Sequence, residues 1–111
     1  MVRHYVPDTG DIVWLEFSPH AGHEQAGHRP ALVLSPAAYN KNGMMICCPM
    51  TTQIKGYPFE VVICAKDVSG AVLSDQVKSL DWRARKATLK GKISTDELVE
   101  VRGKISALLS L

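Results

Sequence analysis

Eleven residues, from Ser18 to His28, hold the densest group of titratable side chains in the sequence. These side chains are His20, His23, Glu24 and His28, and Arg29 follows them directly. Imidazole and carboxylate groups can move protons, and a guanidinium presents a planar set of donors that matches phosphate oxygens. Because long connections in small domains are often functional, this segment is the first candidate for a site.

A zinc site is one chemistry that these residues could build, but their spacing argues against it. The metalloprotease signature needs two histidines four residues apart on one helical face. His23 and His28 are five residues apart, with Gly27 between them, and no third ligand is evident. Zinc needs three or four protein ligands, so the sequence predicts no bound metal and no other cofactor. Taken singly, each histidine is typical of a surface loop.

Phosphate chemistry suits the polar residues better. A second polar connection, residues 50–59, contributes Thr51, whose hydroxyl could donate to a phosphate oxygen. It also contributes Tyr57, whose ring could stack on a base. The alternative is an ordinary turn between two strands, marked by Gly56 and Pro58. Periodicity alone favours that alternative.

Positive charge is concentrated between residues 78 and 92. This segment has six basic residues and one acid, whereas the rest of the chain has seven basic and ten acidic residues. The six are Lys78, Arg83, Arg85, Lys86, Lys90 and Lys92. Trp82 lies among them, and cations with an interleaved aromatic ring suit a single-stranded nucleic acid. A solvated basic face, or a docking surface for an acidic protein, explains the pattern equally well.

Short strands must position these side chains. Apolar runs predict strands at residues 11–17, 29–35, 44–50, 59–64, 71–80 and 89–93, with one helical turn at 37–42. A capping box at residues 94–97 then starts a helical pattern of apolar residues. Those residues are Leu98, Val101, Ile105, Leu108 and Leu109. We expect a mainly β fold, in which a C-terminal α-helix covers a small, strongly curved antiparallel sheet or half-open barrel.

Length and composition describe a single globular domain, residues 1–111. The chain is 46% apolar and 22% charged, and its net charge of +2 is too small to identify a nucleic-acid binder. No apolar run approaches the roughly 20 residues of a membrane span, and residues 1–8 lack the apolar region of a signal peptide. Cys47 and Cys48 are adjacent, so they cannot easily form a disulfide with each other. A cytoplasmic location is therefore expected.

Three ordered strings resemble the MazF/PemK/Kid family of toxin endoribonucleases, and its MazF branch in particular. They are HEQAGHRPALVLSP after DIVWLEFSP, then TTQIKGYPFEV, then LSDQVKSLDWRAR. The resemblance runs from about Tyr5 to the terminal helix. It implies a compact SH3-like barrel, shared with the gyrase poison CcdB, in a homodimer. It also implies metal-free cleavage of single-stranded RNA, and a MazE-like antitoxin whose acidic, disordered tail blocks the RNA groove.

The resemblance also assigns catalytic roles. Arg29 falls on the family's active-site arginine, Thr51 on its threonine and Glu24 on the glutamate of the MazF branch. Metal-free cleavage uses the RNA 2′-OH as nucleophile, so it needs a base, a charge sink and an acid. Arg29 suits the charge sink because it is nearly always protonated. Thr51 would bind a non-bridging oxygen, and Glu24 would be the base.

Three further residues are expected to assist. His23 or His28 would help the base or act as the acid. His23 and Asp75 also match residues that the Kid branch emphasises, but Leu73 stands where that branch has an additional arginine. This difference favours a MazF-type site.

Base recognition is expected from charged and stacking side chains. The candidates are Lys55, Gly56, Tyr57, Lys78 and Trp82. The resemblance implies a recognition sequence of three or more bases, for which ACA is the guess from close MazF relatives. Two alternatives stay open, a CcdB-like gyrase poison and a non-catalytic RNA-binding module. The pairing of Arg29 with Thr51 argues against the poison, because a protein-binding toxin needs no phosphate site.

Overall fold

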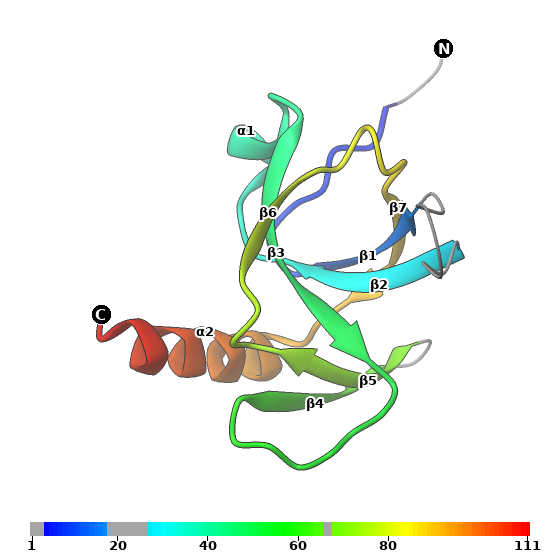
Figure 1. The fold of residues 1–111 in the computed structure, drawn as a ribbon. Coiled ribbons are helices and arrows are strands. Elements are labelled where there is room, and N and C mark those ends of the chain that lie inside the picture. The colour runs from blue at the N-terminus through cyan, green and yellow to red at the C-terminus, as the bar shows by residue number, and fades with distance from the viewer. Residues whose placement is uncertain (1–3, 18–26, 66–67) are drawn as a thin grey trace, which may run out of the picture.

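The computed structural model describes residues 4–17, 27–65 and 68–111, which form seven strands and two helices. Their bounds are β1 (Asp11–Phe17), β2 (Gly27–Val33), α1 (Ala37–Asn40), β3 (Met44–Thr51), β4 (Glu60–Ala65), β5 (Val68–Leu73), β6 (Lys78–Asp81), β7 (Thr88–Lys92) and α2 (Thr95–Leu109). Figure 1 shows the strands wrapped into a curled sheet with α2 along one side. The predicted mainly β fold with a strongly curved antiparallel sheet and a C-terminal helix is confirmed.

The long strand β3 joins two parts of this sheet. The strands pair in the order β4-β5-β3-β2-β1-β7, and β6 joins β3 outside this path. The first half of β3 pairs with β6, its middle pairs with β2, and its end, Met50 and Thr51, pairs with β5. Thr51 therefore lies where the part built on β1 and β2 meets the part built on β4 and β5.

Residues 71–80 were predicted to form one strand, long or bent in its middle, and the structure instead divides this segment into two strands, β5 and β6, with a turn between them. Strand β5 ends at Leu73, and the backbone N–H of Gln76 donates to the Leu73 carbonyl at 3.1 Å. Strand β6 begins at Lys78 and pairs with the start of β3, whereas β5 pairs with its end. The polar residues 74–76 interrupt the apolar run, as is typical of a turn.

Two clusters of buried side chains fill the opposite faces of β1, β2 and β3. Alternate residues of a strand point to opposite faces. Ile12 and Leu32 therefore belong to the cluster that α2 covers, whereas Val13 and Val33 belong to the cluster around Trp82. Both faces of the central strands are thus occupied, and a polar site must lie where these strands end.

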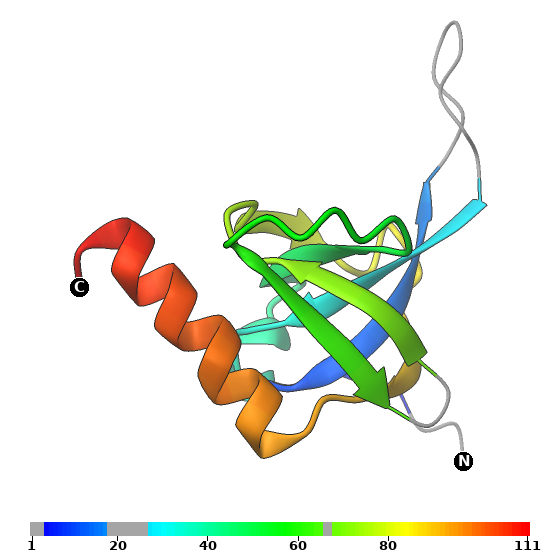
Figure 2. The same ribbon diagram turned by 90° about the horizontal axis from the view of Figure 1, so that it is seen from below.

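Helix α2 begins with the predicted capping box. The Ser94 hydroxyl accepts the Glu97 backbone N–H, and the Glu97 carboxylate accepts the Ser94 N–H, each at 3.1 Å. Val101 packs into the core, but Leu108 and Leu109 are 56% and 60% exposed. Figure 2 shows the C-terminal end of α2 extending beyond the sheet. The prediction that these two leucines pack on the sheet is therefore wrong.

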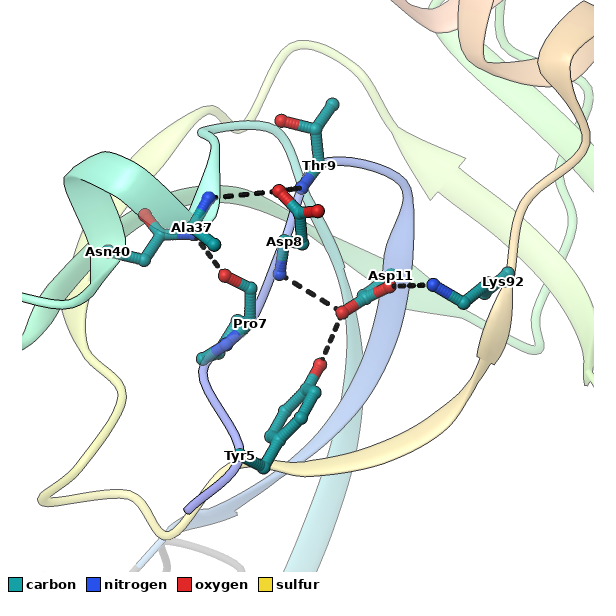
Figure 3. Close-up of polar contacts among 8 residues, drawn as sticks. All are labelled: Tyr5, Pro7, Asp8, Thr9, Asp11, Ala37, Asn40 and Lys92. Atoms are coloured by element: carbon teal, nitrogen blue, oxygen red, sulfur yellow. Dashed lines mark hydrogen bonds and ion pairs between the residues drawn. The ribbon is translucent and has the colours of Figure 1, made fainter. Parts of the chain in front are cut away.

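A buried carboxylate, Asp11, ties the N-terminal segment to β1 and β7 (Figure 3). Its Oδ2 accepts the Tyr5 hydroxyl at 2.6 Å and the Asp8 backbone N–H at 3.0 Å, and its Oδ1 accepts the Lys92 ammonium at 2.9 Å. The Asp8 carboxylate accepts the backbone N–H of Ala37 at 2.9 Å, and this bond lowers the pKa of Asp8. The segment before β1 is thus held by hydrogen bonds to two carboxylates, one of which also pairs with Lys92.

We expect the Tyr5 contact to make stability fall at alkaline pH. Burial, and then the hydrogen bond to Asp11, raise the pKa of Tyr5 above its ordinary value. Its contribution is complete below about pH 10, where an unfolded tyrosine ionises, and is lost as the pH rises further. Tyr5→Phe should cost about 1–2 kcal/mol at neutral pH, and its stability should change less between pH 9 and 11.

Urea unfolding across this pH range measures both effects. The matched control is Tyr39→Phe, because Tyr39 is 43% exposed. The Tyr39→Phe variant should follow the wild-type profile. Parallel pH profiles for wild type and Tyr5→Phe would contradict the expectation.

Candidate functional site

Arg29 and Thr51 come together at the ends of two neighbouring strands. Ala31 of β2 faces Pro49 of β3, and continuing this register by two residues brings Arg29 level with Thr51. On its other side Arg29 faces Leu15 of β1. The sheet therefore places the Arg29 guanidinium and the Thr51 hydroxyl at neighbouring strand ends, as the sequence predicted.

Three neighbouring hollows share Thr51, and two of them also share Arg29; together we call them the groove. The first has a volume of about 460 Å³ and is lined by both residues, by Lys78 and by Arg85. The second has a volume of about 680 Å³ and shares both residues. The third, of about 190 Å³, shares Thr51 and adds Lys55. Among the described residues that line the first two hollows none is acidic, which suits a polyanion.

Gly70 allows the close packing that places Thr51. Thr51 ends β3 and faces Ala71 of β5, and its Oγ1 accepts the backbone N–H of Gln53 at 3.1 Å. Gly70 has φ +145°, and a Cβ built there would lie 2.6 Å from the Thr51 carbonyl oxygen. Only a glycine fits such an approach between two backbones. The sequence analysis missed Gly70, although a lone glycine beside a strand pattern is a usual signal of this arrangement.

The loop between β3 and β4 brings three predicted RNA-binding residues to the groove. Lys55 and Tyr57 line the third hollow, and Gly56 lies between them. The Tyr57 ring is 50% exposed and stacks on Phe59 with 5.2 Å between ring centroids. The backbone N–H groups of Lys55 and Gly56 both donate to the carboxylate of Glu60, a residue that the sequence analysis treated only as part of a strand.

The prediction that Trp82 stacks on a base must be corrected. Trp82 is 6% exposed, and its Nε1–H donates to the Asn40 carbonyl at 2.7 Å, so its ring belongs to the core. Trp14 of β1 lines the second hollow in its place. The Lys90 ammonium lies 4.1 Å from the centroid of the Trp14 ring, and the His28 ring lies 5.9 Å from it. Trp14 is not one of the residues predicted for the site, because it lies within an apolar strand pattern.

The basic stretch splits into two sets in three dimensions. Lys78, Arg85 and Lys90 line the groove, as the charge pattern allows. Lys92 instead pairs with Asp11, and Arg83 donates to the Lys41 carbonyl at 2.7 Å. The sequence does not separate these two sets, because cations that line the groove and cations that bind other parts of the chain are interspersed between residues 78 and 92.

The remaining predicted residues have different outcomes. Glu24 and His23 lie outside the described residues. His28 lies beside the pair in the second hollow, and its Nε2 is 3.7 Å from the Glu16 carboxylate. Asp75 is exposed in the turn after β5, and it does not line the hollows described above.

Within the described ranges no group of three His, Cys, Asp or Glu side chains could hold a metal. Neither described helix is long and apolar enough to cross a membrane.

Known proteins share this fold and match the chain over nearly its whole length. Residues 8–109 match the family model described as PemK-like, MazF-like toxin of type II toxin–antitoxin system. The endoribonuclease toxin MazF of Escherichia coli K12 is 56% identical, over 98% of this chain and 99% of its own. The endoribonuclease toxin ChpB of the same strain is 41% identical, over 90% of each chain. In a crystal structure of MazE–MazF from Deinococcus radiodurans, a chain with 57% identity superposes with a TM-score of 0.92, covering 97% of this chain and 99% of that one.

Proposed function

Because the chain belongs to the PemK-like, MazF-like toxin family of type II toxin–antitoxin systems and is an endoribonuclease like its MazF relatives, we propose that it cuts single-stranded RNA at short specific sequences without a metal ion. The observation that carries this proposal is the meeting of Arg29 and Thr51 where three basic or polar hollows join. A single phosphate at this junction reaches a guanidinium and a hydroxyl, while the strand on either side follows a hollow. Cutting messenger RNA in this way would stop translation and arrest growth.

The reaction needs only groups that the substrate and this chain supply. The RNA 2′-oxygen forms a bond to the adjacent phosphorus as the bond from phosphorus to the 5′-oxygen breaks, which leaves a 2′,3′-cyclic phosphate and a 5′-OH. Arg29 stabilises the negative charge that develops on the phosphorane, and the Thr51 hydroxyl donates to a non-bridging oxygen. Glu24 accepts the 2′-OH proton, and His28 or His23 gives a proton to the leaving oxygen.

Cleavage in the presence of EDTA tests the proposal directly. Purified protein with a single-stranded RNA should give the same sites and rate, within about twofold, with and without the chelator, and the fragments should carry cyclic phosphate ends. Mapping the sites tests whether ACA lies among them. Loss of cutting in EDTA that added metal restores would contradict the metal-free route.

The same assay separates the two alternative functions. RNA that is bound without being cut would indicate a non-catalytic binding module. An inert protein that traps gyrase on DNA would indicate a CcdB-like poison. The combination of a guanidinium and a hydroxyl at the groove argues against the poison, since a protein-binding toxin needs no phosphate site, and the assay separates cleavage from binding alone.

Partners follow from the same surface. We propose a cytoplasmic homodimer, in which a second copy extends the groove, and inhibition by a MazE-like antitoxin with an acidic, disordered tail. The matching Deinococcus chain is in a structure with MazE, which supports an antitoxin partner. The cations at the groove, Lys78, Arg85 and Lys90, would attract acidic side chains as they attract phosphates.

A further inference from the structure

We infer that Glu60 and Lys104 are positioning residues that hold the loop of residues 52–59 as a preformed wall of the groove, and thereby set RNA affinity and sequence selectivity without touching the RNA. This inference rests on the proposed function, because it needs the groove to bind RNA. It goes further by assigning roles to a buried acid and to a cation of the distant helix α2. Neither residue has a place in the chemistry derived above.

The Glu60 carboxylate lies on the wall of a groove that is proposed to bind a polyanion. A negative charge at this place needs an explanation. It lines the third hollow together with Lys55 and Tyr57, yet it is only 8% exposed. A negative charge there repels phosphate, and burying an unpaired charge is costly. A role in contacting RNA therefore does not account for Glu60, whereas a role in holding the protein backbone does.

The contacts of Glu60 show what it holds. Its Oε1 accepts the backbone N–H of Gly56 at 2.8 Å and that of Lys55 at 3.1 Å, and its Oε2 lies 3.4 Å from the same Lys55 nitrogen. The Glu60 backbone N–H donates to the Tyr57 carbonyl at 3.0 Å, which closes the turn. Hydrogen bonds to a charged acceptor are about twice as strong as neutral ones, so one side chain fixes two consecutive peptides.

These hydrogen bonds also limit which groups of the loop can bind an RNA base. The amides of Lys55 and Gly56 are already used by Glu60, so they are not available as donors to a base. Gly56 has φ +78°, a conformation that favours glycine, and it shapes the turn. Recognition is then left to the Lys55 ammonium and the exposed Tyr57 ring, whose positions depend on the backbone that Glu60 holds.

Contacts with helix α2 and with Ser74 hold the C-terminal part of the loop, residues 58 and 59. The Lys104 ammonium donates to the carbonyl of Pro58, and the Ser74 backbone N–H donates to the carbonyl of Phe59 at 3.1 Å. Figures 1 and 2 show the loop returning to the start of β4 beside α2. The loop is therefore held at residues 55–56 and at residues 58–59 in the absence of RNA. Holding a binding segment in advance lowers the conformational entropy that is lost on binding.

The first test replaces the acceptor while keeping its size. Glu60→Gln keeps one acceptor oxygen but removes the negative charge, and its NH₂ group takes the place of Oε2 beside the Lys55 N–H, so the bonds to both amides weaken and the loop should loosen. We expect the KM for a short RNA to rise about tenfold, kcat to stay within about twofold, and cutting at non-cognate sequences to increase. The KM and kcat should separate because Arg29 and Thr51 keep their places. The matched control, Glu100→Gln, changes an exposed glutamate on α2 and should behave as wild type.

A second variant tests the C-terminal part of the loop and guards against misfolding of the first. Lys104→Met should raise KM about threefold with unchanged kcat, whereas Arg102→Met, an exposed cation two residues earlier on the same helix, should not. Amide hydrogen exchange gives a readout that needs no RNA. Exchange at Lys55 and Gly56 should be at least tenfold faster in Glu60→Gln than in wild type.

The outcomes separate this inference from the proposed function. A wild-type protein that cuts no RNA would overturn the function and the recognition role with it. If wild type cuts RNA and both variants keep the wild-type KM and selectivity, the function stands and the positioning role is overturned. Faster amide exchange without a change in KM would overturn it too, because the loop would then be held for stability alone.

Discussion

Replacing Arg29 with alanine should lower the rate of RNA cleavage by about 10²–10³-fold, the usual cost of removing one preorganised donor to a developing oxyanion. The guanidinium lies at the junction of the first and second hollows, so a phosphate held there meets it at the moment of reaction. Arginine side chains in general are poor proton acceptors, which favours a role in stabilising charge over a role as a base. The expected loss is therefore in kcat more than in RNA binding.

Three comparisons make the Arg29 result decisive. An oligonucleotide with 2′-deoxyribose at the scissile position cannot react, so its affinity reports binding alone and should fall less than tenfold in Arg29→Ala. Arg102→Ala removes an exposed cation on α2 and serves as a control for net charge. Arg29→Lys keeps the charge without the planar pair of donors and should recover only part of the rate. Cleavage by Arg29→Ala at the wild-type rate would contradict the assignment.

The pattern of apolar residues predicted most of the strands, because apolar residues alternate clearly along most of them. Ile12 belongs to one core and Val13 and Leu15 belong to the other, as alternation along a strand predicts. Periodicity failed at residues 71–80 because it records which residues are apolar and not which strand they pair with. Strands β5 and β6 pair with opposite ends of β3, and only that tertiary pairing separates them.

The two tryptophans show a second limit. Trp82 stands among cations and was expected at the surface, but its indole N–H finds the Asn40 carbonyl inside the fold. Trp14 stands in an apolar strand and was not among the predicted site residues, but Lys90 lies over its ring at the groove. In each case the deciding partner lies far away in the sequence, so neighbouring residues could not reveal it.

Residues that position others were the hardest to predict. Arg29 and Thr51 could be named because their chemistry matches a phosphate and because their motifs resemble a known family. Glu60 and Gly70 act through the backbone of other residues, so their side-chain types alone say nothing about the site. Their roles follow from distances, such as the 2.8 Å between Glu60 and the Gly56 nitrogen.

Gly70→Ala should lower kcat by about 10²-fold, because the new Cβ would collide with the backbone that carries Thr51. The added atom would lie 2.6 Å from the Thr51 carbonyl oxygen, and real Cβ atoms essentially never approach so closely. The positive φ of Gly70 adds strain for alanine, so the residue itself resists the change. The pairing of Thr51 with Ala71 must then open, and a displacement approaching 1 Å at a catalytic group can cost this much.

A loss of folding must be separated from this loss of rate. Gly70→Ala should also reduce the free energy of unfolding by about 1–3 kcal/mol, so kcat is measured at a temperature where circular dichroism shows the variant folded. Gly103→Ala is the matched control, because nothing lies within 4 Å of a Cβ there and alanine in a helix stabilises by about 0.5–1 kcal/mol. A folded Gly70→Ala protein with wild-type kcat would mean that the position of Thr51 does not limit the reaction. The hydroxyl would then lose its proposed role, while the role of Arg29 would be untouched, since the three nearest atoms to a Cβ at Gly70 belong to Thr51 and Thr52.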